Sequence, residues 1–63
     1  MQIHEFINYS KNIVSPMIIF NKRGEEIGTF EKETILNLFS NNTIDKIGAI
    51  SKGEIAYIAL FLD

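Results

Sequence analysis

The segment that most constrains the fold is residues 55–62, in which every side chain is apolar. It reads Ile-Ala-Tyr-Ile-Ala-Leu-Phe-Leu, with Glu54 before it and Asp63 after it. Successive side chains of a strand point to opposite faces, so both faces of this strand are apolar. Strands of this kind lie in sheets that are covered on both sides. The fold must therefore bury this segment on two faces.

Residues 44–62 are predicted to form a β-hairpin that contains this strand. Its turn falls at Ser51-Lys52-Gly53-Glu54, where Lys52-Gly53 is the expected tight centre. A turn of this length joins two neighbouring strands, so the segment before it is expected to pair with residues 55–62.

A second hairpin is predicted over residues 17–30. The apolar run Met-Ile-Ile-Phe is followed by Asn-Lys-Arg-Gly-Glu and a looser strand. Gly24 can supply the positive φ of the loop, and Asn21 can hydrogen-bond its own backbone there. Gly28 is expected at a bulge or where a ring such as that of Phe30 crosses the strand.

The segment between the hairpins has helical periodicity. Ile35, Leu38 and Phe39 fall on one face, which predicts a helix over residues 31–40 that packs through these three side chains. Residues 2–11 fit both a helix and a strand, and a helix is the prediction. Ser15-Pro16 ends this first segment, because proline lacks an N–H group and drives the residue before it towards extended geometry.

These elements predict an α+β fold: one small domain over residues 1–63, with a mainly antiparallel four-stranded sheet and the helix of residues 31–40 on one face. Two short helices can cover only one face of the sheet. We therefore expect a homodimer, or a partner protein, to cover the other. The expected interface residues are Ile58, Leu60 and Leu62, which share one face of the last strand.

Composition argues against several kinds of chemistry. The absence of cysteine excludes disulfides, thiolate metal sites and a cysteine nucleophile. His4 is the only histidine and diverges from Glu5, and no carboxylate spacing fits a metal site or an acid/base pair. We expect no metal, no cofactor and no enzymatic activity. No apolar stretch reaches the roughly 18 residues that span a bilayer, so a cytoplasmic location is expected.

The favoured function is a non-enzymatic protein-binding module, a small regulator or inhibitor that occludes the surface of a larger host protein. The apolar excess of the last strand motivates this hypothesis. The chain contains twelve Ile and six Asn, with five Lys to one Arg. Together with the small size, this bias is similar to that of small proteins from phages or mobile elements of low-GC bacteria, a resemblance of composition that involves no motif.

Two alternatives stay open. Lys22, Arg23 and Lys52 lie in the two predicted hairpin turns and could contact the phosphates of a nucleic acid, with one exposed aromatic ring for stacking. The formal net charge of −2 and the Ile and Leu residues around the rings make this the weaker hypothesis. The other alternative, a small-molecule site in a dimer cleft, has no marker in the sequence.

Overall fold

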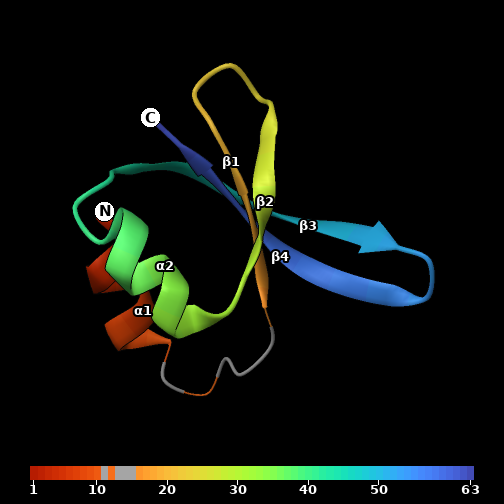
Figure 1. Cartoon of the computed structure of the whole chain (residues 1–63), viewed down its shortest axis with the longest axis horizontal. Coiled ribbons are helices and arrows are strands. Elements are labelled where there is room, and N and C mark those ends of the chain that lie inside the picture. Colours follow the sequence, from red (N-terminus) through yellow and green to blue (C-terminus); the bar gives the residue numbers. More distant parts are fainter. Residues whose placement is uncertain (11, 13–15) are drawn as a thin grey trace.

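The protein is a small α+β unit, seen here in a computed structural model that describes residues 1–10, 12 and 16–63 (Figure 1). Helix formation in the first segment is confirmed, and both predicted hairpins form. The elements are α1 (Ile3–Tyr9), β1 (Met17–Phe20), β2 (Glu26–Phe30), α2 (Lys32–Phe39), β3 (Ile44–Lys52) and β4 (Ile55–Leu62). The predicted break falls at Ser15-Pro16, and Ser15 lies outside the described residues.

The four strands form one mixed sheet in the order β2-β1-β4-β3. The two hairpins are antiparallel as predicted, whereas β1 and β4 pair in parallel at the centre, with Ile18 opposite Ala59 and Phe20 opposite Phe61. The connection through α2 explains the parallel pair. Because α2 carries the chain back along the sheet, β2 and β3 run in the same direction, and so do their hairpin partners β1 and β4.

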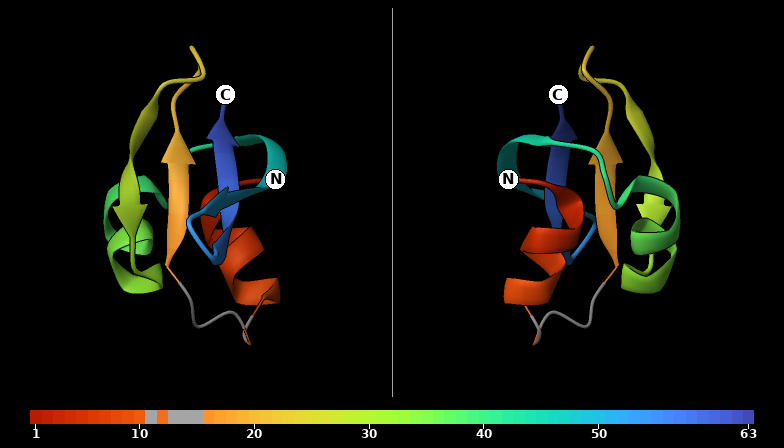
Figure 2. Two further views of the ribbon diagram at one scale, coloured as in Figure 1. Left: turned by 90° about the vertical axis from the view of Figure 1, so that its right-hand side faces the viewer. Right: turned by 90° about the vertical axis from the view of Figure 1, so that its left-hand side faces the viewer.

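Both helices pack on one face of the sheet (Figure 2). Beneath them lies a core of buried side chains from both helices and from β1, β3 and β4: Ile3, Ile7, Met17, Ile19, Ile35, Ile44, Leu60 and Leu62. Ile35 and Phe39 of α2 face this core as predicted, but Leu38 is 60% exposed and Leu36 packs in its place. The expected packing of Leu38 is therefore wrong.

The N-terminal residues are tied to the connection between α2 and β3. The Ile3 N–H donates to Asn42 O at 2.9 Å, and the Ile44 N–H donates to Met1 O at 2.7 Å. His4 Nδ1 lies 2.8 Å from Ser40 O, so the ring donates to this carbonyl. These contacts hold α1 beside α2, although the two helices are far apart in the sequence.

Both turns depend on a glycine with positive φ. Gly24 has φ +82°, and Asn21 Oδ1 accepts from the Arg23 and Glu25 N–H groups at 2.9 and 3.0 Å, which confirms the predicted loop. In the second hairpin the ladder continues to Lys52, so Gly53 (φ +64°) and Glu54 form the turn. The predicted centre was therefore one residue too early.

Candidate protein-binding surface

The sheet face away from the helices carries a row of side chains that crosses all four strands. In register, Glu26 is opposite Phe20, Phe20 is opposite Phe61, and Phe61 is opposite Lys46. The rings of Phe20 and Phe61 stack with centroids 4.5 Å apart, and Lys46 Nζ lies 4.8 Å from the Phe61 centroid. Since Phe20 and Lys46 come from the strands on either side of β4, the Phe61 ring is flanked on both sides by side chains of its own chain.

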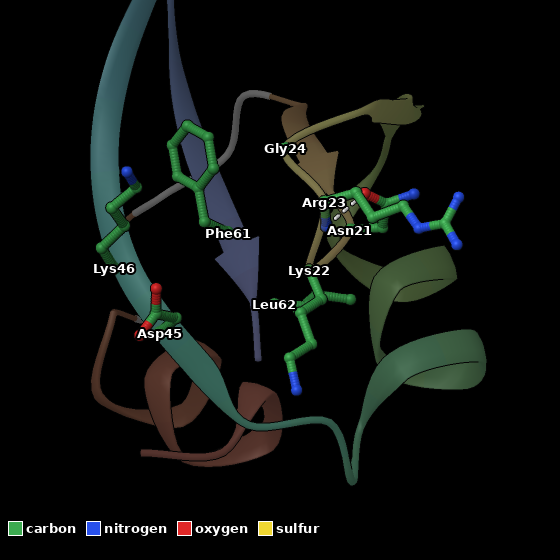
Figure 3. A pocket seen from close by; sticks show the side chains of 8 residues that line it. All are labelled: Asn21, Lys22, Arg23, Gly24, Asp45, Lys46, Phe61 and Leu62. Atoms are coloured by element: carbon green, nitrogen blue, oxygen red, sulfur yellow. Dashed lines mark hydrogen bonds between the residues drawn. The ribbon is translucent and has the colours of Figure 1, made fainter.

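A hollow of about 250 Å³ lies beside Phe61 and Lys46 of this row (Figure 3). Three cationic residues line it, namely Lys22, Arg23 and Lys46, together with the carboxylate of Asp45. The Arg23 side chain extends away from Phe61 in this view. The structure thus brings the predicted Lys22 and Arg23 near Lys46, which sequence reasoning missed because only the register between β3 and β4 places it there.

Lys52, the third predicted anion contact, lies outside the residues that line the hollow. Its Nζ atom is 2.8 Å from Glu26 Oε1 and 2.9 Å from Glu26 Oε2. Glu26 is on β2 and Lys52 on β3, the two edges of the sheet, which would lie about 14 Å apart if the sheet were flat. The ion pair therefore reaches across the coiled sheet, and Glu26 neutralises the charge of Lys52.

Two residues on the face without helices are fully buried within the single chain. Ile18 and Ala59 lie opposite each other in register, and both are 0% exposed. Side-chain alternation places them on the same face as Phe20 and Phe61. The single chain therefore covers the inner part of this face by itself, and a second copy or a partner over the rest of the face stays a prediction.

The predicted interface residues of β4 lie on the other face, beneath the helices. Leu60 is 0% exposed and Leu62 is 6% exposed, both within the hydrophobic core, and Ile58 packs against this core. Packing against α1 and α2 buries Leu60 and Leu62. In this structure Leu60 and Leu62 present no surface to a partner, and any protein contact has to use other side chains.

Such side chains occur on the distal part of the β3–β4 hairpin, residues 47–58, which we call the arm. Figure 1 shows this hairpin projecting from the sheet on the side away from the helices. Ile47 is 50% exposed and Ile55 is 57% exposed. Lys52 and Glu54 are the only charged residues of the arm. Its exposed or half-buried apolar side chains are Ile47, Ala49, Ile50, Ile55, Ala56, Tyr57 and Ile58.

The described residues offer few groups for reactive chemistry. His4 donates to a backbone carbonyl that belongs to the helix-to-strand connection. Within residues 1–10, 12 and 16–63, no three His, Asp or Glu side chains are grouped so that they could hold a metal ion. None of the described helices is long and apolar enough to cross a membrane.

Comparison of the chain with protein-family models, with curated proteins and with solved structures found no match. Its function is therefore inferred from its own residues and their geometry.

Proposed function

We propose that the protein is a non-enzymatic protein-binding module and that the arm is its contact surface. The exposed apolar side chains of the arm are the observation that supports this function. They occupy both faces of a two-stranded ribbon, and Ile47 and Ile55 are at least half exposed. An isolated two-stranded ribbon is only marginally stable in water, so a ribbon of this composition gains from a protein surface packed against it.

The energy available from such packing is modest for each residue and adds up over the arm. Complete burial of an Ile side chain stabilises by roughly 1.5–3 kcal/mol, so half-exposed Ile47 and Ile55 can each contribute about 1 kcal/mol on binding. Arm residues that start half-buried add smaller amounts. Because the arm contains only Lys52 and Glu54 as charged residues, and Lys52 is already paired, little charge has to be desolvated.

The partner class that fits this surface is a protein with an apolar groove or sheet edge. Binding there would occlude the surface of a larger protein, which is the action of a small regulator or inhibitor. We place this action in the cytoplasm, in keeping with the cysteine-free sequence.

The test compares two variants in affinity capture from a lysate of the source cells. Replacing Ile47 and Ile55 together by Thr keeps the β-branched shape and the strand propensity but removes apolar surface. Leu38→Gln is the matched control, because Leu38 is 60% exposed but lies on α2. We expect the double variant to lose a protein that both the unmodified chain and Leu38→Gln retain. Equal retention by all three chains would rule out the arm as the contact.

A nucleic-acid-binding function is the second candidate, and the hollow is the observation that favours it. Lys22, Arg23 and Lys46 line it. Against it stand Asp45 in the same hollow and the flanked ring of Phe61. This function predicts single-strand binding that weakens steeply with salt and is lost when the three cations are neutralised. Binding that is insensitive to salt would count against it.

A further inference from the structure

We propose that the partner supplies an extended segment that pairs antiparallel with residues 46–51 of β3 and so adds one strand to the sheet. The inference rests on the proposed function, since it states how the partner meets one side of the arm. It follows from the backbone groups along the outer edge of β3, from the N-terminal residues that already pair on this edge, and from the charges at its beginning.

The outer edge of β3 lacks a neighbouring strand over most of its length. β3 ends the strand order, and no described strand pairs with its outer side. Its ladder with β4 is regular from Lys46 to Lys52, beyond the bulge near its beginning. The other edge strand, β2, has five residues and an irregular register with β1. The regular part of β3 is therefore the longer free edge of the sheet.

The turn of the β3–β4 hairpin determines which backbone groups of β3 point outward. Gly53 and Glu54 lie between the paired residues Lys52 and Ile55, and of these two turn residues only the glycine has positive φ, as in a type II′ turn. In such a turn the carbonyl group of the residue before the turn faces the N–H group of the residue after it. The backbone groups of Lys52 are therefore directed towards β4.

Backbone bonding alternates along an antiparallel pair, so the groups of every second residue point away from β4. On β3 these outward residues are Ile47, Ala49 and Ser51, and all three are exposed. Ile44 gives an independent check, because its N–H donates outward to Met1 O at 2.7 Å. The bulge that follows Ile44 adds one residue and accounts for the change in alternation.

An extended chain is the ligand that fits these outward groups. N–H and C=O groups that recur at every second residue match the spacing of another strand, whereas a helix uses its backbone groups internally. In this mode of recognition the main-chain hydrogen bonds give affinity, and alternate side chains give specificity. The side chain of Ile47 is half exposed beside this edge, so apolar side chains of the partner can pack against it.

The N-terminal residues already occupy the outer side of the chain where β3 begins. Gln2 forms an antiparallel bridge with Thr43, and Met1 O accepts from the Ile44 N–H. A partner segment beside residues 46–51 would continue the line that this extended part of the chain begins. We place the segment antiparallel, because antiparallel pairing is slightly more stable per residue than parallel pairing.

The charges at the beginning of β3 favour an acidic residue in the partner. Lys46 is exposed and forms no ion pair within residues 1–10, 12 and 16–63. Lys22 and Arg23 line the same hollow, against one carboxylate, that of Asp45. Opposite charges that face each other across two strands stabilise the pair. We therefore expect a partner segment with apolar residues at alternate positions and an acidic residue opposite Lys46.

A synthetic peptide tests strand addition directly. The probe is N-acetylated and C-amidated Val-Thr-Val-Thr-Val-Glu, which places Val opposite each outward residue of β3 and Glu opposite Lys46. N-methylation of its third residue removes an N–H group that faces β3. N-methylation of its fourth residue is the matched control, because that N–H group faces away. A further peptide carries Lys in place of Glu.

NMR hydrogen exchange reports the response of the edge. In the free chain the amides of Ile47, Ala49 and Ser51 should exchange roughly tenfold or more faster than those of Gly48 and Ile50. The peptide should slow exchange at these outward amides and shift their resonances until saturation. Methylation of its third residue should raise the dissociation constant roughly tenfold or more, and methylation of the fourth by a few-fold at most. The Lys peptide should bind roughly several-fold more weakly.

Ala49→Pro relates the edge to the partner itself. The Ala49 N–H points outward, so proline removes no bond to β4, and proline is tolerated at such positions of an edge strand. Ala49→Val keeps the N–H group and is the matched control. With both folds verified by circular dichroism, Ala49→Pro should lose the captured protein that Ala49→Val retains.

Equal effects of the two N-methylated peptides would overturn strand addition, as would outward amides that do not respond to the peptide at millimolar concentration. A captured protein that folded Ala49→Pro retains would also overturn it. If the Ile47 and Ile55 double variant still loses that protein, the proposed function stands and the partner contacts the arm through its side chains alone.

Discussion

Lys52 and Glu26 form an ion pair that joins the two edge strands of the sheet, with 2.8 Å between Lys52 Nζ and Glu26 Oε1. The residues are 26 positions apart in the sequence. The pair lies on the sheet face that carries no helices. The sheet coils so that its two edges approach each other on this face. It also places a carboxylate beside Lys52, which opposes the binding of an anion there.

The energetic contribution of this pair should be small. Both side chains keep substantial exposure, 47% for Lys52 and 38% for Glu26. Solvent screening limits such pairs to about 0–1 kcal/mol. A double-mutant cycle with Lys52→Gln and Glu26→Gln, followed by urea denaturation, should give a coupling energy in this range that shrinks as salt is added. A coupling energy several times larger would mean that the ion pair and the coiling of the sheet stabilise each other.

Gly28 should tolerate no side chain without a cost. A Cβ atom there would lie 3.0 Å from Phe30 Cζ, and the Phe30 ring is held against Phe39 with centroids 5.7 Å apart. Gly28→Ala should lower the free energy of unfolding by roughly 1–3 kcal/mol, the usual cost of overpacking. Gly48→Ala is the matched control, since its Cβ would meet only an ordinary contact at 3.6 Å. Equal effects of the two substitutions would show that the Phe30 ring moves aside freely.

Leu60 and Leu38 should differ strongly in their contribution to stability. Leu60 is fully buried under the helices, whereas Leu38 is 60% exposed. Leu60→Ala should lower the free energy of unfolding by about 2–5 kcal/mol, because it removes apolar contacts and leaves a cavity. Leu38→Ala should change it by about 0.5 kcal/mol or less. Thermal or denaturant unfolding of both variants measures this difference, and a stable Leu60→Ala chain would contradict the described core.

His4 should carry a proton on Nδ1, because this atom faces the Ser40 carbonyl oxygen at 2.8 Å. Nitrogen chemical shifts of the imidazole ring identify the protonated nitrogen directly. His4→Ala should lower the free energy of unfolding by roughly 0.5–1.5 kcal/mol through loss of this hydrogen bond. An unprotonated Nδ1 would show that the ring has turned away from Ser40.

Several features of the fold follow from short stretches of sequence. Gly24, Asn21 and Gly53 determine the turns, because positive φ and side-chain bonding to the backbone are local properties. The alternation of residues 55–62 likewise predicts a strand whose two faces are both apolar. In the structure Leu60 is buried on one face and Ala59 on the other.

The tertiary structure decided what local patterns leave open. Ile35, Leu36, Leu38 and Phe39 are all apolar, so periodicity alone cannot choose between Leu36 and Leu38, and the rotation of α2 against the sheet makes the choice. The parallel pairing of β1 with β4 follows from the direction in which α2 returns the chain. The same pairing aligns Phe20 with Phe61, and the β3–β4 register adds Lys46 beside them.

The candidate binding surface likewise depends partly on the sequence and partly on the tertiary structure. The sequence by itself determined that the last hairpin carries more apolar side chains than two short helices can cover. Only the tertiary structure decided which of them are exposed, because the helices cover one face of the sheet and the arm extends beyond them. Leu60 and Leu62 lie under the helices, while Ile47 and Ile55 lie on the arm, where exposed apolar surface remains.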